Sequence, residues 1–559
     1  MIRPSADKTA QAAPQPRGIR QAMSDLHIWS GLLLGWFLYA MFLTGTVSYF
    51  KDEISQWMRP ELPHQAQVPD AAQATALIAR ELQTLAAGSP QWTINPPDAR
   101  NPGASASWRK PGVEGRAAFQ NASFDPATGR QAAAARETRG GDFFYRFHFQ
   151  FHYMPVPWGR WLAGLAAMFM LVAIVSGVIT HKKIFIDFFT FRWGKGQRSW
   201  LDAHNALSVF GLPFHAMITY TGLVTLMAMY MPWGEQAAYK TPAERQAARA
   251  QMSSFAPPGK PSGQPAELAP VGDMVRQAQA RWGRDNVGRV TIANPGDANA
   301  SVRITRGEDG RVSTSAQFLL FEGSTGRLLQ AKDTSAGGAA ETRSVLVALH
   351  LGRFGDTVVR WLYFLVSLAG TAMVGTGLVL WTVKRRTKLP DPDKPYFGFW
   401  LVERLNIAAI AGLSIGMAGM LWANRLLPLD MVQRAAWEIH AMFIVWGATL
   451  AWAMLRPAKR AWVELLWAGA AALALLPLLN ALTTERGLLA SLRAGDWVFA
   501  GLDLTLLALA ALHAVLAVRT ARHKPKAQRQ AAAPRRQAAP AEPSGGGPMA
   551  EPVLQEAAR

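Results

Sequence analysis

The feature of the chain that most constrains its fold is a duplication of apolar segments long enough to cross a membrane. The strings HIWSGLLLGWFLYAMFLTG and HNALSVFGLPFHAMITYTG begin at His27 and His204, and in each 17 residues separate the histidine from a Thr-Gly dipeptide, at Thr44 and Thr221. Duplicated spans place equivalent positions around a pseudo-two-fold axis. Histidines repeated in this way can face each other between helices.

The next apolar segment of each copy is repeated as well. In both, 15 residues separate a Trp-Leu dipeptide from a hydroxyl residue followed by glycine, from Trp161 to Ser176 and from Trp361 to Thr376. A polar segment lies between the two spans of each copy and ends on a Thr-Gly-Arg turn. The first half is therefore predicted to consist of a span, a module and a second span, built twice.

The composition indicates a polytopic α-helical membrane protein of about eight spans, because half of the 559 residues are hydrophobic and several apolar runs reach membrane length. The predicted spans are 27–50, 158–181, 205–231, 358–383, 400–423, 433–455, 462–482 and 496–519. The predicted boundaries are a disordered tail at 1–22, span 1 at 23–50, a module at 51–155, spans 2 and 3 at 156–231, a second module at 232–352, span 4 at 353–390, a four-span extension at 391–520 and a disordered basic tail at 521–559.

The net charge of +20 is distributed in short segments next to alternate spans. By the positive-inside rule these segments and both termini are cytoplasmic, and the two modules face the other side. A nucleic-acid partner is not expected, since the basic residues do not form one folded patch. The basic segments include Lys182, Lys183, Arg192, Lys384, Arg385, Arg386, Arg456, Lys459, Arg460, Lys524 and Lys526.

The chain contains no cysteine. This excludes disulfides, thiolate ligands of iron–sulfur clusters and covalently attached haem. Any redox cofactor must be held without a covalent bond to the chain.

Each polar segment is predicted to be an α+β module with a binding or docking role. The first is expected to contain a helix at 71–85 and strands at 91–94, 104–109 and 117–124, and the second a helix at 271–282 and strands at 289–293, 301–305 and 315–322. A purely structural role for the modules fits these patterns equally well.

Seven of the eleven histidines lie in or at the ends of the duplicated spans. The predicted topology puts them in two layers, one at each membrane surface, and imidazoles from different helices are the usual axial ligands of non-covalent haem. We expect them to bind a metal or haem. The cytoplasmic layer contains His27, His181 and His204, the outer layer contains His148, His152 and His350, and His215 lies inside span 3.

Two arguments give different pairings. Symmetry favours His27 with His204, and His152 with His350. The helical repeat instead places His204 and His215 on one face of one helix, roughly 16 Å apart, as ligands of two different haems. In that case His181 or His27 stands opposite one of them, and His152 or His350 opposite the other. His148 is left open as a ligand, an orienting group or a substrate contact.

Other interpretations of the same residues compete. A zinc or iron transport site needs carboxylates beside the histidines, and the first four spans contain almost none. Single histidines at a membrane surface often only form hydrogen bonds, and this is the first interpretation for His440 and His513 in the later spans, with a cofactor or quinone role as the second. The glycines of the spans allow close packing of helices or of a flat macrocycle, and ordinary helix packing fits any one of them equally well. They are Gly164, Gly177, Gly222, Gly370, Gly375 and Gly377.

Three strings carry a resemblance to a known family: FHFQFHYMPVPWGRWLAG at 147–164, SGVITHKKIFIDFFTFRWGKGQRSWLDAHNALSVFGLPFHAMITYTGL at 176–223 and LHLGRFGD at 349–356. Over about 20–390 the chain resembles the PepSY-associated transmembrane helix family, which comprises inner-membrane proteins associated with bacterial iron uptake. The modules are similar to PepSY domains. Spans 5 to 8 extend beyond the shorter family members.

The resemblance implies a function, because some members of the family are di-haem b-type reductases of ferric siderophores. It implies two haem b groups, a periplasmic ferric siderophore as substrate, a quinol or protein as electron donor, membrane lipid as surroundings and the bacterial inner membrane as location. No catalytic side chain is predicted. The rival functions are a non-enzymatic PepSY protein that binds peptides or restrains a protease, and an iron or siderophore permease. The histidines that match family positions are His27, His148, His152, His181, His204, His215 and His350.

Overall fold

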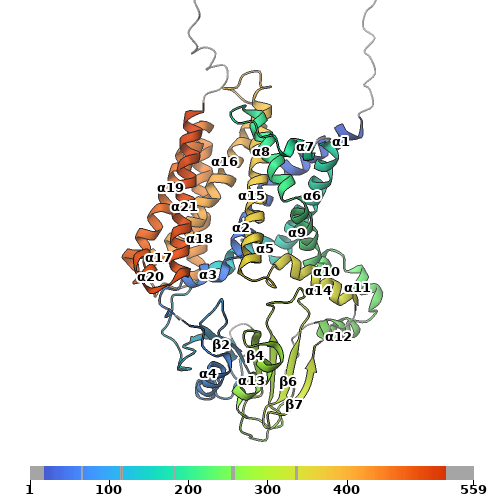
Figure 1. Ribbon diagram of the computed structural model, residues 1–559, viewed down its shortest axis with the longest axis vertical. Coiled ribbons are helices and arrows are strands. Elements are labelled where there is room, and N and C mark those ends of the chain that lie inside the picture. The colour runs from blue at the N-terminus through green and yellow to red at the C-terminus, as the bar shows by residue number, and fades with distance from the viewer. Residues whose placement is uncertain are drawn as a thin grey trace, which may run out of the picture.

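The computed structural model of the protein describes residues 18–64, 67–113, 115, 118–181, 184–252, 259–333 and 338–523. Most of the two predicted tails, at 1–17 and 524–559, lies outside the described residues. The described chain forms a bundle of helices with a β-sheet at one end, and both of its ends lie at the opposite end of the bundle (Figure 1). The first helix begins at Ile19, so the predicted N-terminal tail is too long by four residues.

The helices of the duplicated half come in the same order in both copies. They are α1 (Ile19–Leu33), α2 (Gly35–Ser48), α3 (Lys51–Trp57), α5 (Gly140–Gln150), α6 (Val156–Thr180), α7 (Ile184–Phe188), α8 (Gln197–Phe210), α9 (Leu212–Thr225), α10 (Met227–Tyr230), α11 (Trp233–Ala238), α12 (Pro242–Met252), α14 (Gly338–Leu351) and α15 (Thr357–Arg386). The C-terminal extension consists of α16 (Phe397–Ile407), a π-helical turn (Ala408–Gly412), α17 (Leu413–Leu426), α18 (Arg434–Leu455), α19 (Ala458–Thr483), α20 (Leu488–Ala494) and α21 (Trp497–Arg522).

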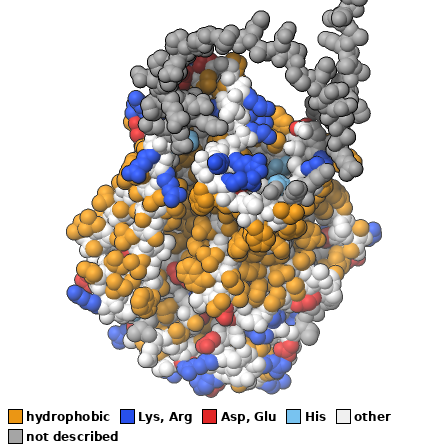
Figure 2. Space-filling view, turned by 45° about the horizontal axis from the view of Figure 1, so that its top comes forward, with side chains coloured by type: hydrophobic (Ala, Val, Ile, Leu, Met, Phe, Trp, Pro, Cys, Tyr) orange, Lys and Arg blue, Asp and Glu red, His pale blue; other side chains and the backbone are white. Residues whose placement is uncertain are grey.

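The predicted fold class, a multi-span helical membrane protein, is confirmed. Within the described residues six helices are long and apolar enough to cross a membrane, and two bent pairs, α1 with α2 and α8 with α9, raise the number to eight if each pair is one span. Hydrophobic side chains form a broad band around the bundle, while charged side chains gather toward its two ends (Figure 2). This band is what a protein that crosses a lipid bilayer presents to it.

The first and third spans are broken, which the sequence analysis did not predict. The axes bend by 65° between α1 and α2 and by 68° between α8 and α9. Gly211 and Pro213 stand at the second break, where proline supplies no amide hydrogen to continue α8. The assumption of one straight helix through His204 and His215 is therefore wrong, and the two histidines do not share a helix face.

The two copies pack in the same way. Helix α1 contacts α6 as α8 contacts α15, α2 contacts α5 as α9 contacts α14, and α2 contacts α15 as α9 contacts α6. The helices α5 and α14 were not predicted, since their residues were assigned to the modules. Their contacts with α2 and α9 make them part of the helical bundle.

The two modules share one sheet. Its seven antiparallel strands run in the order β3-β2-β1-β4-β5-β6-β7, so the two predicted α+β segments are joined edge to edge, which their separate sequence patterns did not indicate. The link is the pairing of β1 with β4, with Thr93 opposite Thr291. The strands are β1 (Gln91–Asn95), β2 (Ala104–Arg109), β3 (Phe119–Phe124), β4 (Val287–Ala293), β5 (Ser301–Arg306), β6 (Phe318–Glu322) and β7 (Leu328–Lys332).

Two helices, α4 (Ala71–Leu85) and α13 (Val271–Trp282), pack on this sheet, and both have the predicted bounds. Ile94 and Val290, one from each module, are fully buried in one hydrophobic core beneath these helices. Burial of such side chains contributes about 1.5–3 kcal/mol each, so the modules stabilise each other. Strand β7 was not predicted, and β6 begins three residues later than expected.

The C-terminal extension is joined to the first half by polar contacts. The indole N–H of Trp57 in α3 donates to the Asp503 carboxylate in α21 over 3.0 Å, and the Arg425 guanidinium lies 3.7 Å from the centre of the Trp57 ring. Arg434, which forms a fully buried ion pair with Glu438 of the same helix, donates to the Glu137 carbonyl of the first half over 3.1 Å. The extension is thus fixed against the sheet end of the bundle.

Candidate functional site

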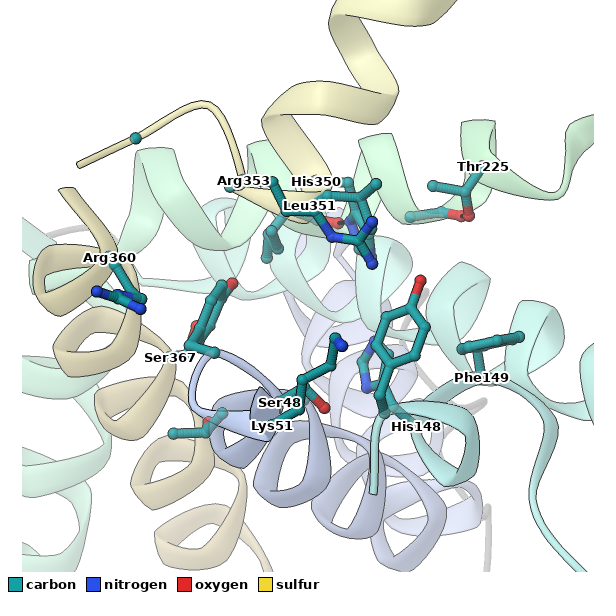
Figure 3. A pocket seen from close by; sticks show the side chains of 18 of the residues that line it. Ser48, Lys51, His148, Phe149, Thr225, His350, Leu351, Arg353, Arg360 and Ser367 are labelled. Carbon is teal, nitrogen blue, oxygen red and sulfur yellow. Dashed lines mark hydrogen bonds between the residues drawn. The ribbon is translucent and has the colours of Figure 1, made fainter. Parts of the chain in front are cut away.

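Two histidines face each other at the end of the bundle that carries the sheet. The rings of His148 on α5 and His350 on α14 have centres 6.2 Å apart and planes inclined by 29°. We call them the sheet-side pair. Both line a cavity of ≈ 710 Å³. Figure 3 shows His148 and Lys51 on one wall of this cavity and His350 and Arg353 on the opposite wall.

Glycine residues bring α5, and with it His148, close to α3. Gly140 has a φ of +55°, which glycine adopts without strain. A Cβ atom on Gly140 would lie 2.6 Å from Ser55 Oγ, and one on Gly141 would lie 2.1 Å from the Lys51 carbonyl oxygen. Larger residues at these positions would push α5 away and move His148.

A second pair lies toward the other end of the bundle. The rings of His27 on α1 and His204 on α8 also have centres 6.2 Å apart, with planes inclined by 65°. We call them the distal pair. The structure thus brings His27 and His204 together, as symmetry favours, but it brings His148 and not His152 opposite His350.

All four paired histidines form the same hydrogen bond. In each, Nδ1 lies next to the backbone carbonyl that is four residues before a glycine on a neighbouring helix. A carbonyl only accepts, so Nδ1 carries the hydrogen and Nε2 keeps its lone pair. The Nδ1 to oxygen distances are 2.8 Å for His27 to Ala173, 2.9 Å for His204 to Met373, 2.7 Å for His148 to Met41 and 2.9 Å for His350 to Ile218.

Those glycines provide the space for the rings. A side chain in their place would collide with the imidazole or compress the contact. A Cβ atom would lie 3.1 Å from the His27 ring at Gly177, 3.1 Å from the His204 ring at Gly377, 2.7 Å from the His148 ring at Gly45 and 2.8 Å from the His350 ring at Gly222.

The hydroxyl residue before each glycine lies near the same carbonyl that accepts from the histidine. Thr376 donates to that carbonyl, whereas the other three hydroxyls donate mainly to the carbonyl four residues before them, over 2.6–2.7 Å, and make a longer contact with the shared one. The distances to the shared carbonyl are 3.3 Å for Ser176 to Ala173, 2.9 Å for Thr376 to Met373, 3.4 Å for Thr44 to Met41 and 3.3 Å for Thr221 to Ile218. Each duplicated Ser/Thr-Gly dipeptide therefore marks the place where one of the four histidines packs against a glycine and donates to a nearby carbonyl. We call this arrangement a glycine seat. The spacing of these dipeptides is visible in the sequence, but the sequence fits close packing of helices and close packing of a flat macrocycle equally well and does not indicate contact with a histidine.

The spacing of the rings in each pair is compatible with one metal ion between them. With Nδ1 engaged, Nε2 is the ligand nitrogen, and a centre-to-centre distance of 6.2 Å leaves space for a metal with a nitrogen about 2 Å away on each side. A bare ion needs further ligands, and within the described residues no group of three or more His, Asp or Glu side chains could hold a metal ion. Two imidazoles suffice as axial ligands when a planar macrocycle supplies the remaining ones.

The cavity at the sheet-side pair fits a flat apolar group with an anionic edge. Its inner wall is apolar and includes Leu38, Phe42 and Ala163, while its mouth has cations. The Nε atom of Arg360 is buried there without a hydrogen-bond partner among the described residues, although the same guanidinium pairs with Glu53 over 2.8 Å. The other cations that line the cavity are Lys51, Arg100 and Arg353.

Loops from both modules reach this mouth. Arg100, between β1 and β2, donates to the Tyr49 carbonyl and to Glu53, both over 2.9 Å. Gly310, between β5 and β6, donates its N–H to the Phe354 carbonyl over 3.0 Å. The sheet is thus attached to the bundle where the cavity opens.

The other predicted ligands lie elsewhere. His215, near the start of α9, is 1% exposed and has the rings of Phe42 and Phe214 beside it. His181, at the end of α6, accepts a 2.9 Å hydrogen bond at Nε2 from the Asn205 side chain, next to the distal pair.

His152 lies at the junction with the C-terminal extension. Its ring stacks on Phe443 with centres 5.6 Å apart and contacts Tyr153, whose hydroxyl is hydrogen-bonded to Nδ1 of His440. His513 donates from Nδ1 to the Leu509 carbonyl of its own helix over 2.8 Å. His152, His440 and His513 do not form the arrangement of the paired histidines, in which Nδ1 donates to a carbonyl four residues before a glycine on a neighbouring helix.

Comparison with known protein families gives a match over more than half of the chain. The model of the family described as PepSY-associated TM region matches residues 24–384. The matched segment contains both histidine pairs and their four glycines, and it ends before the C-terminal extension. No curated protein matches the chain at a significant level.

Proposed function

We propose a function for this chain from the premise that it belongs to the PepSY-associated TM family: it binds two haem b groups between its paired histidines and reduces a ferric chelate. The four histidines seated alike, and facing each other in pairs at two levels, support this function most directly. A haem bound between two imidazoles supplies a one-electron Fe(III)/Fe(II) couple. Two such groups at different depths provide a path for electrons along the bundle.

The chain's own residues hold and orient the groups. The Met41 carbonyl accepts from Nδ1 of His148, so Nε2 keeps its lone pair and no proton has to leave the imidazole before it binds iron. The apolar wall of the cavity excludes water. Among the cations that line the cavity, Arg360 keeps a buried Nε–H without a partner among the described residues, which suits a carboxylate of a haem edge.

The substrate side of the proposal is the mouth between the modules and the bundle. A ferric siderophore that docks against the loops of Arg100 and Gly310 lies next to the sheet-side pair. Transfer of one electron converts its Fe(III) to Fe(II), which hard oxygen ligands hold less strongly, and the iron is released.

The proposed orientation follows the positive-inside rule. The end of the bundle with both termini faces the cytoplasm, and the sheet faces the periplasm of a bacterial inner membrane. A quinol or a protein donor would supply electrons to the group that His27 and His204 would hold, and His148 and His350 would hold the group nearer the substrate.

The reduced-minus-oxidised absorbance spectrum of the purified protein, with haem quantified as its pyridine complex, tests this function. We expect two b-type haems per chain and, after reduction, formation of Fe(II) from a ferric siderophore at a rate that depends on the haem content. A colourless protein from cells supplied with haem would overturn the proposal and favour peptide binding or iron transport.

A further inference from the structure

His215 lies in α9, three residues before Ile218, whose carbonyl accepts from His350 of the sheet-side pair. Helix α15 provides the depth scale: Ser367 lines the sheet-side cavity, Gly370 contacts the His215 ring and Gly377 contacts His204 of the distal pair. With a rise of about 1.5 Å per residue, Gly370 is roughly 4.5 Å from the level of Ser367 and roughly 10.5 Å from that of Gly377.

His215 occupies a glycine seat like those of the paired histidines, but its ring is reversed. A Cβ atom on Gly211 would lie 2.4 Å from the ring, and one on Gly370 would lie 2.9 Å from Nε2. The ring lies 3.3 Å, through Nε2, from the carbonyl of Val366, four residues before Gly370. In the paired histidines Nδ1 lies next to the carbonyl, whereas in His215 it is Nε2 that does so.

The rings beside His215 connect it to the cavity. Phe42 contacts it edge to face, with ring centres 6.3 Å apart, and Phe42 itself lines the cavity of the sheet-side pair. Both Phe42 and His215 lie against Gly370, where a Cβ atom would be 2.7 Å from the Phe42 ring. Two aromatic rings thus fill the space from the cavity toward the distal pair.

A buried polar ring inside a membrane protein costs free energy relative to phenylalanine of similar shape. We propose that His215 and Phe42 form the bridge through which electrons pass between the two pairs, and that His215 is not an axial ligand. This inference rests on the proposed function and identifies the connection between its two cofactors. Electrons cross one at a time, and no bond to His215 forms or breaks.

The bridge is tested with His215→Leu and Phe42→Leu, each of which removes one ring and keeps an apolar side chain. The protein is reconstituted into lipid vesicles, fully reduced and mixed with external ferricyanide, which does not cross the membrane. In molecules whose sheet faces outward, a fast absorbance change reports oxidation of the sheet-side haem. A slow change reports oxidation of the distal haem, whose electrons leave through the sheet-side haem. We expect both variants to keep two haems per chain and to slow the second phase by roughly tenfold or more.

His513→Leu is the matched control, since His513 is also a buried histidine against a glycine, Gly469, but lies in the C-terminal extension. It should leave both phases unchanged. Loss of one haem in His215→Leu would show that His215 is a ligand, and two haems with an unchanged slow phase in both variants would show that the rings only fill space. Either result overturns the bridge alone, whereas a colourless wild-type protein overturns the proposed function and the bridge together.

Discussion

Gly45 packs against the imidazole ring of His148, so closely that a Cβ atom on Gly45 would lie 2.7 Å from Nδ1 of the ring. The variant Gly45→Ala should displace this ring from the Met41 carbonyl. Alanine favours a helix by roughly 1 kcal/mol over glycine, so any loss will not come from a weaker helix. We expect one haem per chain in place of two, measured as the pyridine complex.

Gly31→Ala is the control for this variant, because no atom lies within 4 Å of a Cβ atom built on Gly31 in α1. It should retain both haems. Two haems in Gly45→Ala would mean that the glycine seat is not required for binding.

Replacement of His148 should distinguish it from His152, four residues later and beyond the end of α5. We expect His148→Ala and His350→Ala each to lose the same haem, and the double variant to lose no more than either single one, because the two imidazoles act as a unit. His152→Ala should keep both, since its ring stacks on Phe443. Absorbance spectra and haem counts of the four proteins test this, and loss of a haem in His152→Ala alone would refute the pairing.

Breaking the buried ion pair of the C-terminal extension should destabilise the protein. Glu438 accepts hydrogen bonds from Arg434 and, over 2.7 Å, from Asn424, and both members of the ion pair are fully buried. Glu438→Leu leaves the Arg434 charge without its partner, at a cost of about 3–5 kcal/mol. Thermal unfolding in detergent should show a marked decrease in midpoint.

The double variant Arg434→Met with Glu438→Leu is the matched test, because it removes both charges. It should recover most of the lost stability, since a buried ion pair is often no more stable than apolar residues of similar volume. A double variant as unstable as Glu438→Leu would mean that the pair has a further structural role.

Asp297 should make the stability of the sheet depend on pH. Its carboxylate accepts hydrogen bonds from the backbone of Ser262, from Asn299, from the Ser262 hydroxyl and from Gly263, which lower its pKa to about 2. The folded state therefore holds the charged form more strongly than the unfolded state. The resulting stabilisation is complete above about pH 4 and disappears as the pH falls through about 2.

Asp297→Asn should lower the unfolding midpoint at pH 7, and the difference from the wild type should shrink between pH 4 and pH 2. Asp285→Asn, at an exposed carboxylate of the same module, is the control and should change little. A difference between Asp297→Asn and the wild type that stays constant down to pH 2 would contradict this account.

The helices of the modules and the membrane character of the chain were predictable because both depend on local patterns. The helix Ala71–Leu85 has apolar residues at helical spacing and begins after Asp70, which caps it by accepting from the Gln73 N–H. The apolar runs of the spans are equally local. The breaks in the first and third spans were missed, since hydropathy does not distinguish a straight helix from a bent one.

The pairing of the histidines depended on contacts that sequence spacing does not reveal. His148 and His152 are four residues apart, but the helix α5 ends at Gln150, so only His148 projects from it toward His350. The repeated Ser/Thr-Gly dipeptides were the available signal, because each of them seats one histidine. Reading them as seats required knowledge of which helices are neighbours.

The joining of the two modules was also beyond local patterns. Strands β1 and β4 are almost 200 residues apart in the sequence, and either could have been an edge strand of its own module. Their pairing buries side chains of both modules in one core. Such long-range pairing is decided by tertiary packing.

The seam between β1 and β4 also bears on the ancestry of the chain. In the antiparallel register Thr93 pairs with Thr291, Trp92 with Ile292 and Ile94 with Val290, so equivalent positions exchange across a two-fold axis that passes between the two threonines. A chain of half the length could pair with a second copy of itself along this strand and form both histidine pairs as a symmetric homodimer. Fusion of the two halves removes the need for assembly from separate subunits and lets the two sides of the mouth evolve different sequences.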